Sequence, residues 1–200
     1  MDQPENKTPN QEQNDSVFQN VGSFIWDLAK ILIIALVIIV PFRTFIAEPF
    51  VVSGSSMLPN FHNHDYLIID RLSYIVGHPS RGDVIVLRFP KDTTQFFIKR
   101  IIGLPGETVQ IQGGYVTIFN AQHPEGFRVN EPYLVSQTET LGQPQKQTLG
   151  SGEYFVLGDN RTASSDSRVW GILPKDDIVG RVWARVYPFS GAGFFHTPSY

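Results

Sequence analysis

A short loop of small and hydroxyl-bearing residues is the segment of this 200-residue chain best suited to chemistry. Residues 53–59 read SGSSMLP, so that three serine hydroxyls lie in one turn-like stretch. A serine hydroxyl is a poor nucleophile near neutral pH and needs a base that takes its proton. The presence of such a base therefore decides whether this loop is a nucleophile or only a flexible turn.

Lys99 is the candidate base. A lysine can accept a proton when burial lowers its pKa towards neutrality. On a strand, Lys99 shares one face with Phe97 and Ile101, because side chains alternate, and it then lies between two apolar groups. A solvated lysine at the rim of a strand is the alternative. Taken with residues 53–59, Lys99 indicates a serine–lysine hydrolase.

Histidines near the serine loop offer two other interpretations. His62 and His64 lie close to it in sequence, with Asp65 adjacent. A Ser-His-Asp triad needs partners from separate elements, which three neighbours on one turn rarely provide. The same residues form a weak metal-binding pattern, and the chain has no cysteine for thiol catalysis or zinc ligation. We therefore expect no metal and no cofactor.

A second polar loop concentrates groups that can organise a site. Residues 158–168 read GDNRTASSDSR and carry small hydroxyls, two carboxylates and two guanidinium groups. A hydroxyl from this loop could orient the lysine amine, as the third member of a catalytic triad orients its base. A polar turn closed by Asp–Arg pairs is the simpler interpretation, and both can hold at once.

The chain after residue 50 is rich in short β-forming runs. They are residues 66–70, 83–89, 96–102, 108–111, 115–119, 154–157 and 181–187. Residues 113–114, Gly-Gly, indicate a hairpin, and residues 120–150 are expected to form an inserted loop or flap. The pattern predicts a mostly β fold in residues 48–190, with a curled or barrel-like antiparallel sheet, followed by a C-terminal tail of residues 191–200.

An apolar run near the N-terminus indicates a membrane anchor. Residues 31–40 carry no polar side chain, and we expect residues 24–47 to form one transmembrane helix after a disordered polar tail of residues 1–23. A buried soluble helix would normally show a polar stripe. A cleaved secretory signal would have an unusually long and acidic N-terminal region here.

The distribution of charged residues predicts the orientation of this anchor in the membrane, and the net charge argues against nucleic acid as a partner. Lys7 and Lys30 precede the apolar run and Arg43 follows it, so the positive-inside rule leans towards a cytoplasmic N-terminus. The net charge of -3 gives no basis for binding nucleic acid, which needs a basic face.

Five motifs follow the apolar run in order. They read SGSSMLP (53–59), HDYLI (64–68), RGDVIV (81–86), IKRIIGLPGE (98–107) and GDNR through SSDSR (158–168). In this order they resemble the motifs of type I signal peptidases, also called leader peptidases. The resemblance covers about residues 26–187 and is specific because all five motifs occur together.

The resemblance implies roles for individual residues. Ser56 would be the nucleophile, its backbone N–H would help to bind the oxyanion, and Lys99 would be the general base. Ser164 would hydrogen-bond the lysine amine, while Asp166 and Arg168 would stabilise the site through a salt bridge.

The family removes signal peptides from exported preproteins and favours small residues at the −1 and −3 positions. The matching positions imply shallow apolar subsites lined by Phe50, Val52, Met57, Phe97 and Ile98. The expected partners are preprotein signal peptides and membrane lipid. The expected location is a single-pass membrane protein with its catalytic domain outside the cytoplasm, in the plasma membrane or an internal membrane such as the thylakoid.

The chain departs from the family pattern at several positions. Gly54 stands where some members carry a serine that completes the oxyanion hole, Asn60 stands where threonine is usual, and His64 replaces a common glycine. Residues 107–153 are short compared with larger members, so the second β subdomain should be reduced.

Two other functions remain to be weighed. A self-cleaving repressor also uses serine and lysine but needs a DNA-binding segment, whereas this chain has an apolar N-terminal run. A catalytically silent, membrane-tethered β domain that binds a partner is the alternative from a different class.

Overall fold

The computed structural model describes residues 24–37, 39–40, 47–134, 140, 145–195 and 197–198. The chain forms two compact units, residues 1–44 and residues 45–200. The described part of the first unit is helical over residues 24–37 and 39–40.

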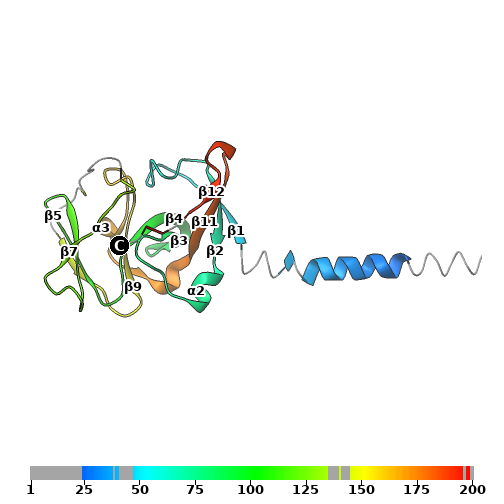
Figure 1. Ribbon diagram of the computed structural model, residues 1–200, viewed down its shortest axis with the longest axis horizontal. Coiled ribbons are helices and arrows are strands. Elements are labelled where there is room, and N and C mark those ends of the chain that lie inside the picture. Colours follow the sequence, from blue (N-terminus) through cyan, green and yellow to red (C-terminus); the bar gives the residue numbers. More distant parts are fainter. Residues whose placement is uncertain are drawn as a thin grey trace, which may run out of the picture. The chain divides into compact units, whose positions relative to one another are not determined.

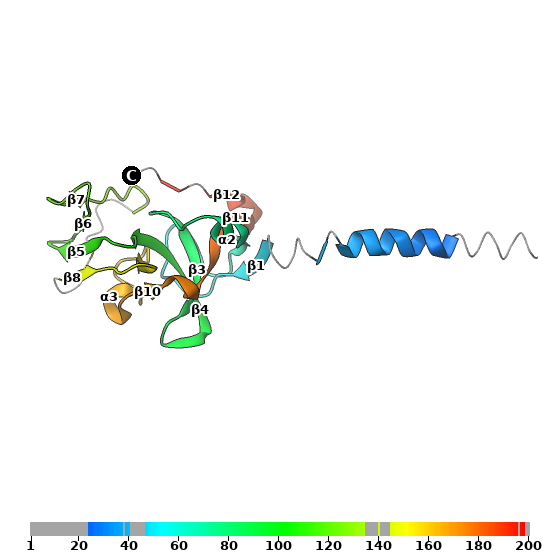
Figure 2. The same ribbon diagram turned by 90° about the horizontal axis from the view of Figure 1, so that it is seen from below.

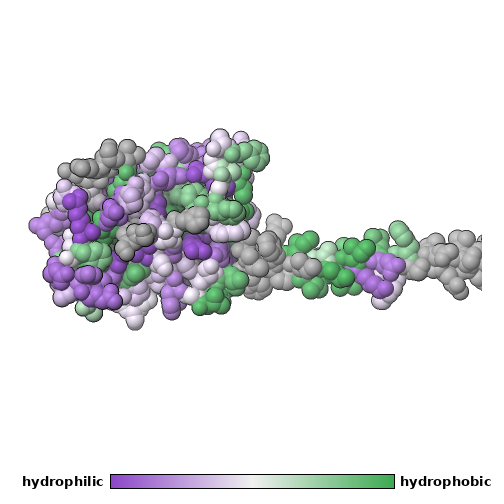
Figure 3. Space-filling view, in the orientation of Figure 1, coloured by the Kyte–Doolittle hydropathy of each residue, from purple (hydrophilic) through white to green (hydrophobic). Residues whose placement is uncertain are grey.

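The face of the N-terminal helix that Figure 3 shows is mostly apolar. Its large hydrophobic side chains are exposed, and its polar groups gather near its start, where Lys30 pairs with Asp27 at 3.2 Å and lies over the Trp26 ring. In the part of the chain that the structure describes, no helix is both long enough and apolar enough to cross a membrane. Residues 38 and 41–46 of the predicted anchor, and the predicted tail of residues 1–23, lie outside the described residues.

The second unit contains two antiparallel sheets, which confirms the prediction of a mostly β fold (Figure 1). The larger sheet has the order β1-β2-β11-β3-β4-β9-β10, with β12 paired to β11. Its strands are β1 (Ala47–Val51), β2 (Tyr66–Asp70), β3 (Val84–Phe89), β4 (Asp92–Gly103), β9 (Glu153–Leu157), β10 (Leu173–Pro174), β11 (Ile178–Tyr187) and β12 (Gly193–Phe194).

The smaller sheet has the order β7-β6-β5-β8 and lies beside the larger one (Figure 1). Its strands are β5 (Thr108–Gln112), β6 (Tyr115–Phe119), β7 (Phe127–Arg128) and β8 (Gln145–Thr148). The hairpin predicted at residues 113–114 joins β5 to β6. No described strand pairing joins the two ends of the larger sheet, so the expected barrel-like closure does not form among the described residues.

Short helical turns connect the strands. They are α2 (Leu72–Val76), α3 (Ser167–Trp170) and the 3₁₀ turns η2 (Lys175–Asp177) and η3 (Phe189–Gly191). Part of the predicted C-terminal tail is packed rather than free, because β12 joins the larger sheet and the Phe195 ring lies 4.5 Å from the Phe61 ring, centroid to centroid.

Strand β4 gives the site a rigid base. It pairs with β3 on one side and β9 on the other, and Lys99 lies opposite Ile85 of β3. The β3–β4 hairpin projects from the body at its turn, while the C-terminal half of β4 is buried (Figure 2). Alternation along β4 places Ile98 in one core cluster, with Met57 and Val52, and Ile101 in another.

Candidate active site

The structure brings Ser56 and Lys99 into direct contact. Ser56 lies in the turn that follows β1, and Lys99 projects from the middle of β4. The Lys99 Nζ atom donates to Ser56 Oγ at 2.8 Å, although 43 positions separate the two residues. A nucleophile and its base must lie within hydrogen-bond reach of each other, and this pair meets that requirement.

Burial prepares Lys99 to act as a base. Its side chain is only 3% exposed, and desolvation lowers the pKa of its amine from 10.5 to about 8, against the opposing negative charges of Asp166 and Asp159. The amine also donates to the carbonyl of Ile98 at 2.8 Å and lies 5.2 Å from the centroid of the Phe97 ring. The apolar flank expected from strand alternation is therefore present.

The serine loop is bound to the loop of residues 158–161. Asn160 donates its backbone N–H to the carbonyl of Ser56 at 2.9 Å and its side-chain amide to the carbonyl of Ser55 at 3.1 Å. Gly158 allows this close approach, because a Cβ atom there would lie 2.5 Å from the Ser56 carbonyl oxygen and closer still to Ser164 Oγ. The two loops are therefore bound together around Ser56.

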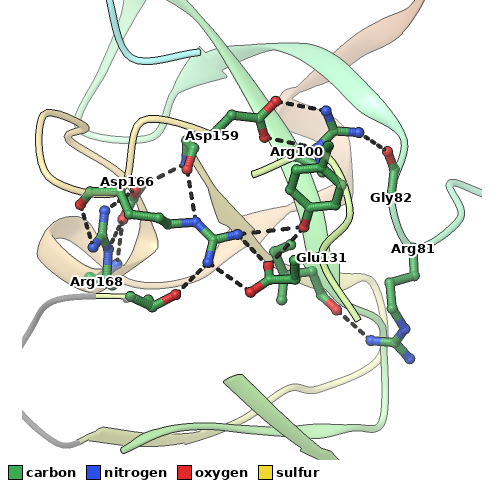
Figure 4. Close-up of polar contacts among 12 residues, drawn as sticks. Arg81, Gly82, Arg100, Glu131, Asp159, Asp166 and Arg168 are labelled. Atoms are coloured by element: carbon green, nitrogen blue, oxygen red, sulfur yellow. Dashed lines mark hydrogen bonds and ion pairs between the residues drawn. The ribbon is translucent and has the colours of Figure 1, made fainter. Parts of the chain in front are cut away.

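Asp166 and Arg168 form the expected ion pair. Arg168 contacts both carboxylate oxygens of Asp166, at 2.8 Å through Nε and 2.7 Å through Nη2. Asp166 also accepts from the backbone N–H of Gly158 at 3.0 Å and caps α3. The pair thus fixes the second loop at both of its ends (Figure 4).

The predicted hydrogen bond from Ser164 to the lysine amine is absent. Ser164 Oγ is a buried hydroxyl with no hydrogen-bond partner. The amine of Lys99 instead donates to Ser56 Oγ and to the carbonyl of Ile98, and Ser164 packs against Gly158.

A buried Arg–Asp pair beside the site was not predicted. Arg100, next to the base on β4, binds both carboxylate oxygens of Asp159, at 2.8 and 2.7 Å, and donates to the carbonyl of Gly82 (Figure 4). Asn60 donates its amide to the same carboxylate at 2.8 Å and to the carbonyl of Tyr133 at 2.9 Å. Arg100 shares a face of β4 with the apolar Ile98 and Ile102, which hints at burial, but no sequence pattern identifies Asp159 as its carboxylate partner.

A second buried cation, Arg161, connects Glu131 and Thr140 to the site. Its guanidinium forms an ion pair with Glu131 and a hydrogen bond with Thr140, and its Nε donates to the carbonyl of Gly158 at 3.0 Å. Tyr133 donates its hydroxyl to Glu131 at 2.8 Å. Residues 120–150 were expected to form an inserted loop or flap, and no sequence pattern linked Glu131 to Arg161. Residues 135–139 and 141–144 of that flap lie outside the described residues.

An open cleft of about 230 Å³ reaches the dyad. Phe50, Phe97 and Ile98 line it, as expected for subsite residues, together with Ser56 and Lys99. Val52 and Met57 do not line it. Both are almost fully buried in the core cluster that contains Ile98, so they support the cleft from within the domain.

The histidine interpretations find no support in the contacts. The carboxylate of Asp65 forms an ion pair with Arg185 at 2.7 Å and accepts the backbone N–H of His62 at 2.9 Å. Asp65 is therefore not the partner of a histidine ring.

A serine hydroxyl and a buried lysine amine thus meet at a cleft that is partly lined by apolar side chains. Residues 25–187 match the family model described as "Signal peptidase, peptidase S26". The chain belongs to this family of peptidases.

Relatives match over most of their length. The chain is similar to the probable signal peptidase I-1 of Synechocystis sp. (36% identity, covering 85% of this chain and 86% of the relative) and to signal peptidase I of Leptolyngbya laminosa (38%, 84% and 83%). It is also similar to signal peptidase I P of Bacillus subtilis subsp. natto (34%, 88% and 95%). A crystal structure of a signal peptidase I from Enterococcus faecalis aligns with 52% of this chain and 96% of that chain, with 34% identity and a TM-score of 0.44.

Proposed function

We propose that this protein removes signal peptides from exported preproteins by acyl transfer through Ser56 and Lys99. The hydrogen bond of 2.8 Å between Lys99 Nζ and Ser56 Oγ, at the end of an apolar cleft, is the observation that carries the proposal. The cleft suits the small side chains that the family accepts at the −1 and −3 positions.

The reaction begins when the neutral amine of Lys99 takes the proton of the Ser56 hydroxyl. The serine oxygen attacks the scissile carbonyl carbon, and the backbone N–H of Ser56 donates to the oxyanion that forms. The protonated lysine then gives its proton to the departing amine, which leaves an acyl-enzyme. A water molecule that gives up a proton to Lys99 attacks the ester carbonyl carbon, and Lys99 returns a proton to the departing Ser56 oxygen, which releases the signal peptide and restores the free enzyme.

Asp166 and Arg168 stabilise this arrangement rather than react. Asp166 of this ion pair accepts the backbone N–H of Gly158, and Gly158 packs against the carbonyl of Ser56 in the serine loop. Both side chains are buried, and the positive charge of Arg168 offsets the negative charge of Asp166. Lys99 therefore experiences a weaker electrostatic attraction than an unpaired carboxylate would exert.

We further propose that residues 24–47 anchor the protein in a membrane, with the N-terminus in the cytoplasm and the peptidase unit outside it. The apolar surface of the described helix and the charges at Lys7 and Lys30 support this topology. Anchoring places the peptidase and the signal peptide in the same membrane, which raises their effective concentration.

To test the proposal, the full chain in detergent is incubated with a preprotein whose signal peptide ends in Ala-x-Ala, and cleavage is measured. Ser56→Ala and Lys99→Ala should each lose at least about 10³-fold in kcat/KM, because the dyad acts as a unit. Lys91→Ala, which changes an exposed lysine outside the cleft, should keep wild-type turnover.

Two results would contradict the proposal. One is wild-type turnover by either dyad variant. The other is the absence of any cleavage by the folded wild-type chain, which would favour the catalytically silent domain.

A further inference from the structure

We infer that Asn160 is a positioning residue for the oxyanion hole, because its side chain sets the direction of the Ser56 backbone N–H. The inference rests on the proposed function, since it concerns the same nucleophile. Asn160 belongs to the loop of residues 158–168 and contacts the backbone of the serine loop.

The contact falls on the peptide group that carries the oxyanion donor. The carbonyl oxygen of Ser55 accepts from Asn160 Nδ2 at 3.1 Å and, within its own loop, from the backbone N–H of Leu58 at 3.2 Å, so Asn160 is the donor that the other loop supplies. This carbonyl and the N–H of Ser56 belong to one planar peptide group. In a trans peptide the C=O and the N–H point in opposite directions, so a bond that fixes one fixes the other.

The direction that results is towards the substrate. Ser55 and Ser56 line the cleft, whereas Asn160 does not. With its C=O directed at Asn160, the peptide group directs the N–H of Ser56 away from Asn160. Among the described residues, no acceptor is assigned to this N–H, so it remains available to an incoming oxyanion.

Asn160 also holds the following carbonyl. Its backbone N–H donates to the carbonyl of Ser56 at 2.9 Å, so one residue binds the carbonyls on both sides of the nucleophile. The asparagine is itself oriented, because its Oδ1 accepts the hydroxyl of Thr162 at 3.1 Å, which assigns the NH₂ group to Ser55.

A second donor in the loop is already occupied. The N–H of Gly54 donates to Asn63 Oδ1 at 2.9 Å, and Gly54 has no side chain to offer. The oxyanion hole of this chain therefore depends on the Ser56 N–H more heavily than a site with a serine at position 54, and its orientation matters correspondingly more.

The test compares Asn160→Asp and Asn160→Ala with the wild-type chain. Aspartate keeps the shape of asparagine but places an acceptor opposite the Ser55 carbonyl, and alanine removes the donor without adding charge. Both variants should lower kcat by about 10- to 100-fold and change KM less than about threefold, since a lost oxyanion donor costs about 10²–10³ in kcat. Asn130→Asp, an exposed change of equal charge, should leave kcat unchanged.

Three further readouts separate positioning from other effects. The affinity for a substrate-derived peptide aldehyde, which forms a tetrahedral adduct with Ser56, should fall in parallel with kcat. The acid limb of the Asn160→Ala pH profile should stay at the wild-type pH, because the Ser56–Lys99 contact does not involve Asn160. The melting temperature of the variants should stay within a few degrees of wild type.

Several outcomes would overturn the inference. One is a wild-type kcat in both Asn160 variants. A second is a loss of kcat in Asn160→Asp that disappears when the pH is above the pKa of Lys99. A third is an aldehyde affinity that equals that of the wild type. Any of these, with an active wild type and an inactive Ser56→Ala, leaves the proposed function standing. Loss of cleavage in the wild type itself would instead count against the proposed function.

Discussion

In the mechanism that we propose, Lys99 sets the pH dependence of cleavage, because only its neutral amine can take the serine proton. Burial lowers its pKa to about 8, so the protonated, inactive form dominates below that pH. We expect kcat/KM to rise about tenfold per pH unit below pH 8 and to level off above it. A cleavage assay from pH 6 to pH 10 measures the profile.

The same assay tests the identity of the base. Lys99→Arg should be inactive throughout the range, because a guanidinium does not lose its proton. If kcat/KM of the wild-type chain instead levelled off above about pH 6.5, the base would be a histidine and not Lys99.

The burial of Lys99 also has a cost in stability. Its pKa in the folded chain, about 8, lies below the ordinary 10.5, so the folded state binds the proton more weakly than the unfolded state. The penalty is fully present below pH 8, where it amounts to about 3 kcal/mol, and it disappears as the pH rises to 10.5. Lys99→Met should therefore unfold at a higher denaturant concentration than wild type at pH 7. The difference should shrink by pH 10; a gain that is independent of pH would show that packing, not charge, is responsible.

At the scale of elements, the close contact of two loops is the feature most sensitive to a small change. In Gly158→Ala the new methyl group would lie 2.5 Å from the Ser56 carbonyl oxygen, which is part of the backbone. The serine loop must then move, and we expect kcat/KM to fall by about 10²-fold or more, because small displacements of a reacting group are costly. Gly193→Ala, where a Cβ would meet nothing within 4 Å, is the matched control and should behave as wild type.

The ion pair between Glu131 and Arg161 of the second loop should contribute strongly to stability. Arg161 is fully buried, and Glu131 is its carboxylate partner. Glu131→Gln leaves that guanidinium charge uncompensated, which costs about 3–5 kcal/mol for a buried pair. Chemical denaturation should report the loss. Glu125→Gln, at an exposed ion pair with His123, should leave the transition midpoint unchanged, and equal midpoints for the two variants would contradict the assignment.

What the sequence predicted at this scale follows from local pattern. The strands at residues 66–70, 84–89 and 115–119 carry alternating or continuous apolar side chains, and these patterns do not depend on distant residues. Strand β8 is polar and exposed and forms through its pairing with β5, so no local signal identifies it. The same distinction separates site residues.

Ser56 and Lys99 could be found by chemistry, motif and register, because each carries its own signal. The partners of Arg100 and Arg161 could not, because Asp159 and Glu131 reach them only through tertiary folding. Ser164 shows the opposite case: its motif position implied a hydrogen bond to Lys99, whereas its hydroxyl is buried beside Gly158 without a hydrogen-bond partner.

For the whole molecule, the separation of the chain into two compact units bears on how the peptidase meets its substrate. Residues 45–200 contain both sheets, three core clusters and the complete dyad. Removing residues 1–44 should therefore leave a folded peptidase that cleaves a short soluble peptide with nearly wild-type kcat/KM. Cleavage of a preprotein inserted in lipid vesicles should fall by at least about 10²-fold, because the proximity supplied by a shared membrane is lost.

The comparison of the two substrates makes this prediction specific. If the chain without residues 1–44 cleaves neither the soluble peptide nor the vesicle-bound preprotein, its active site is damaged. Circular dichroism would then show whether the chain has unfolded or whether catalysis itself requires the helix. A variant that keeps both activities would show that residues 24–47 do not act as the anchor that we propose. Replacing residues 1–44 with an unrelated transmembrane helix should restore vesicle cleavage, because on this argument the segment contributes location and apolar length, while Ser56 and Lys99 supply the chemistry.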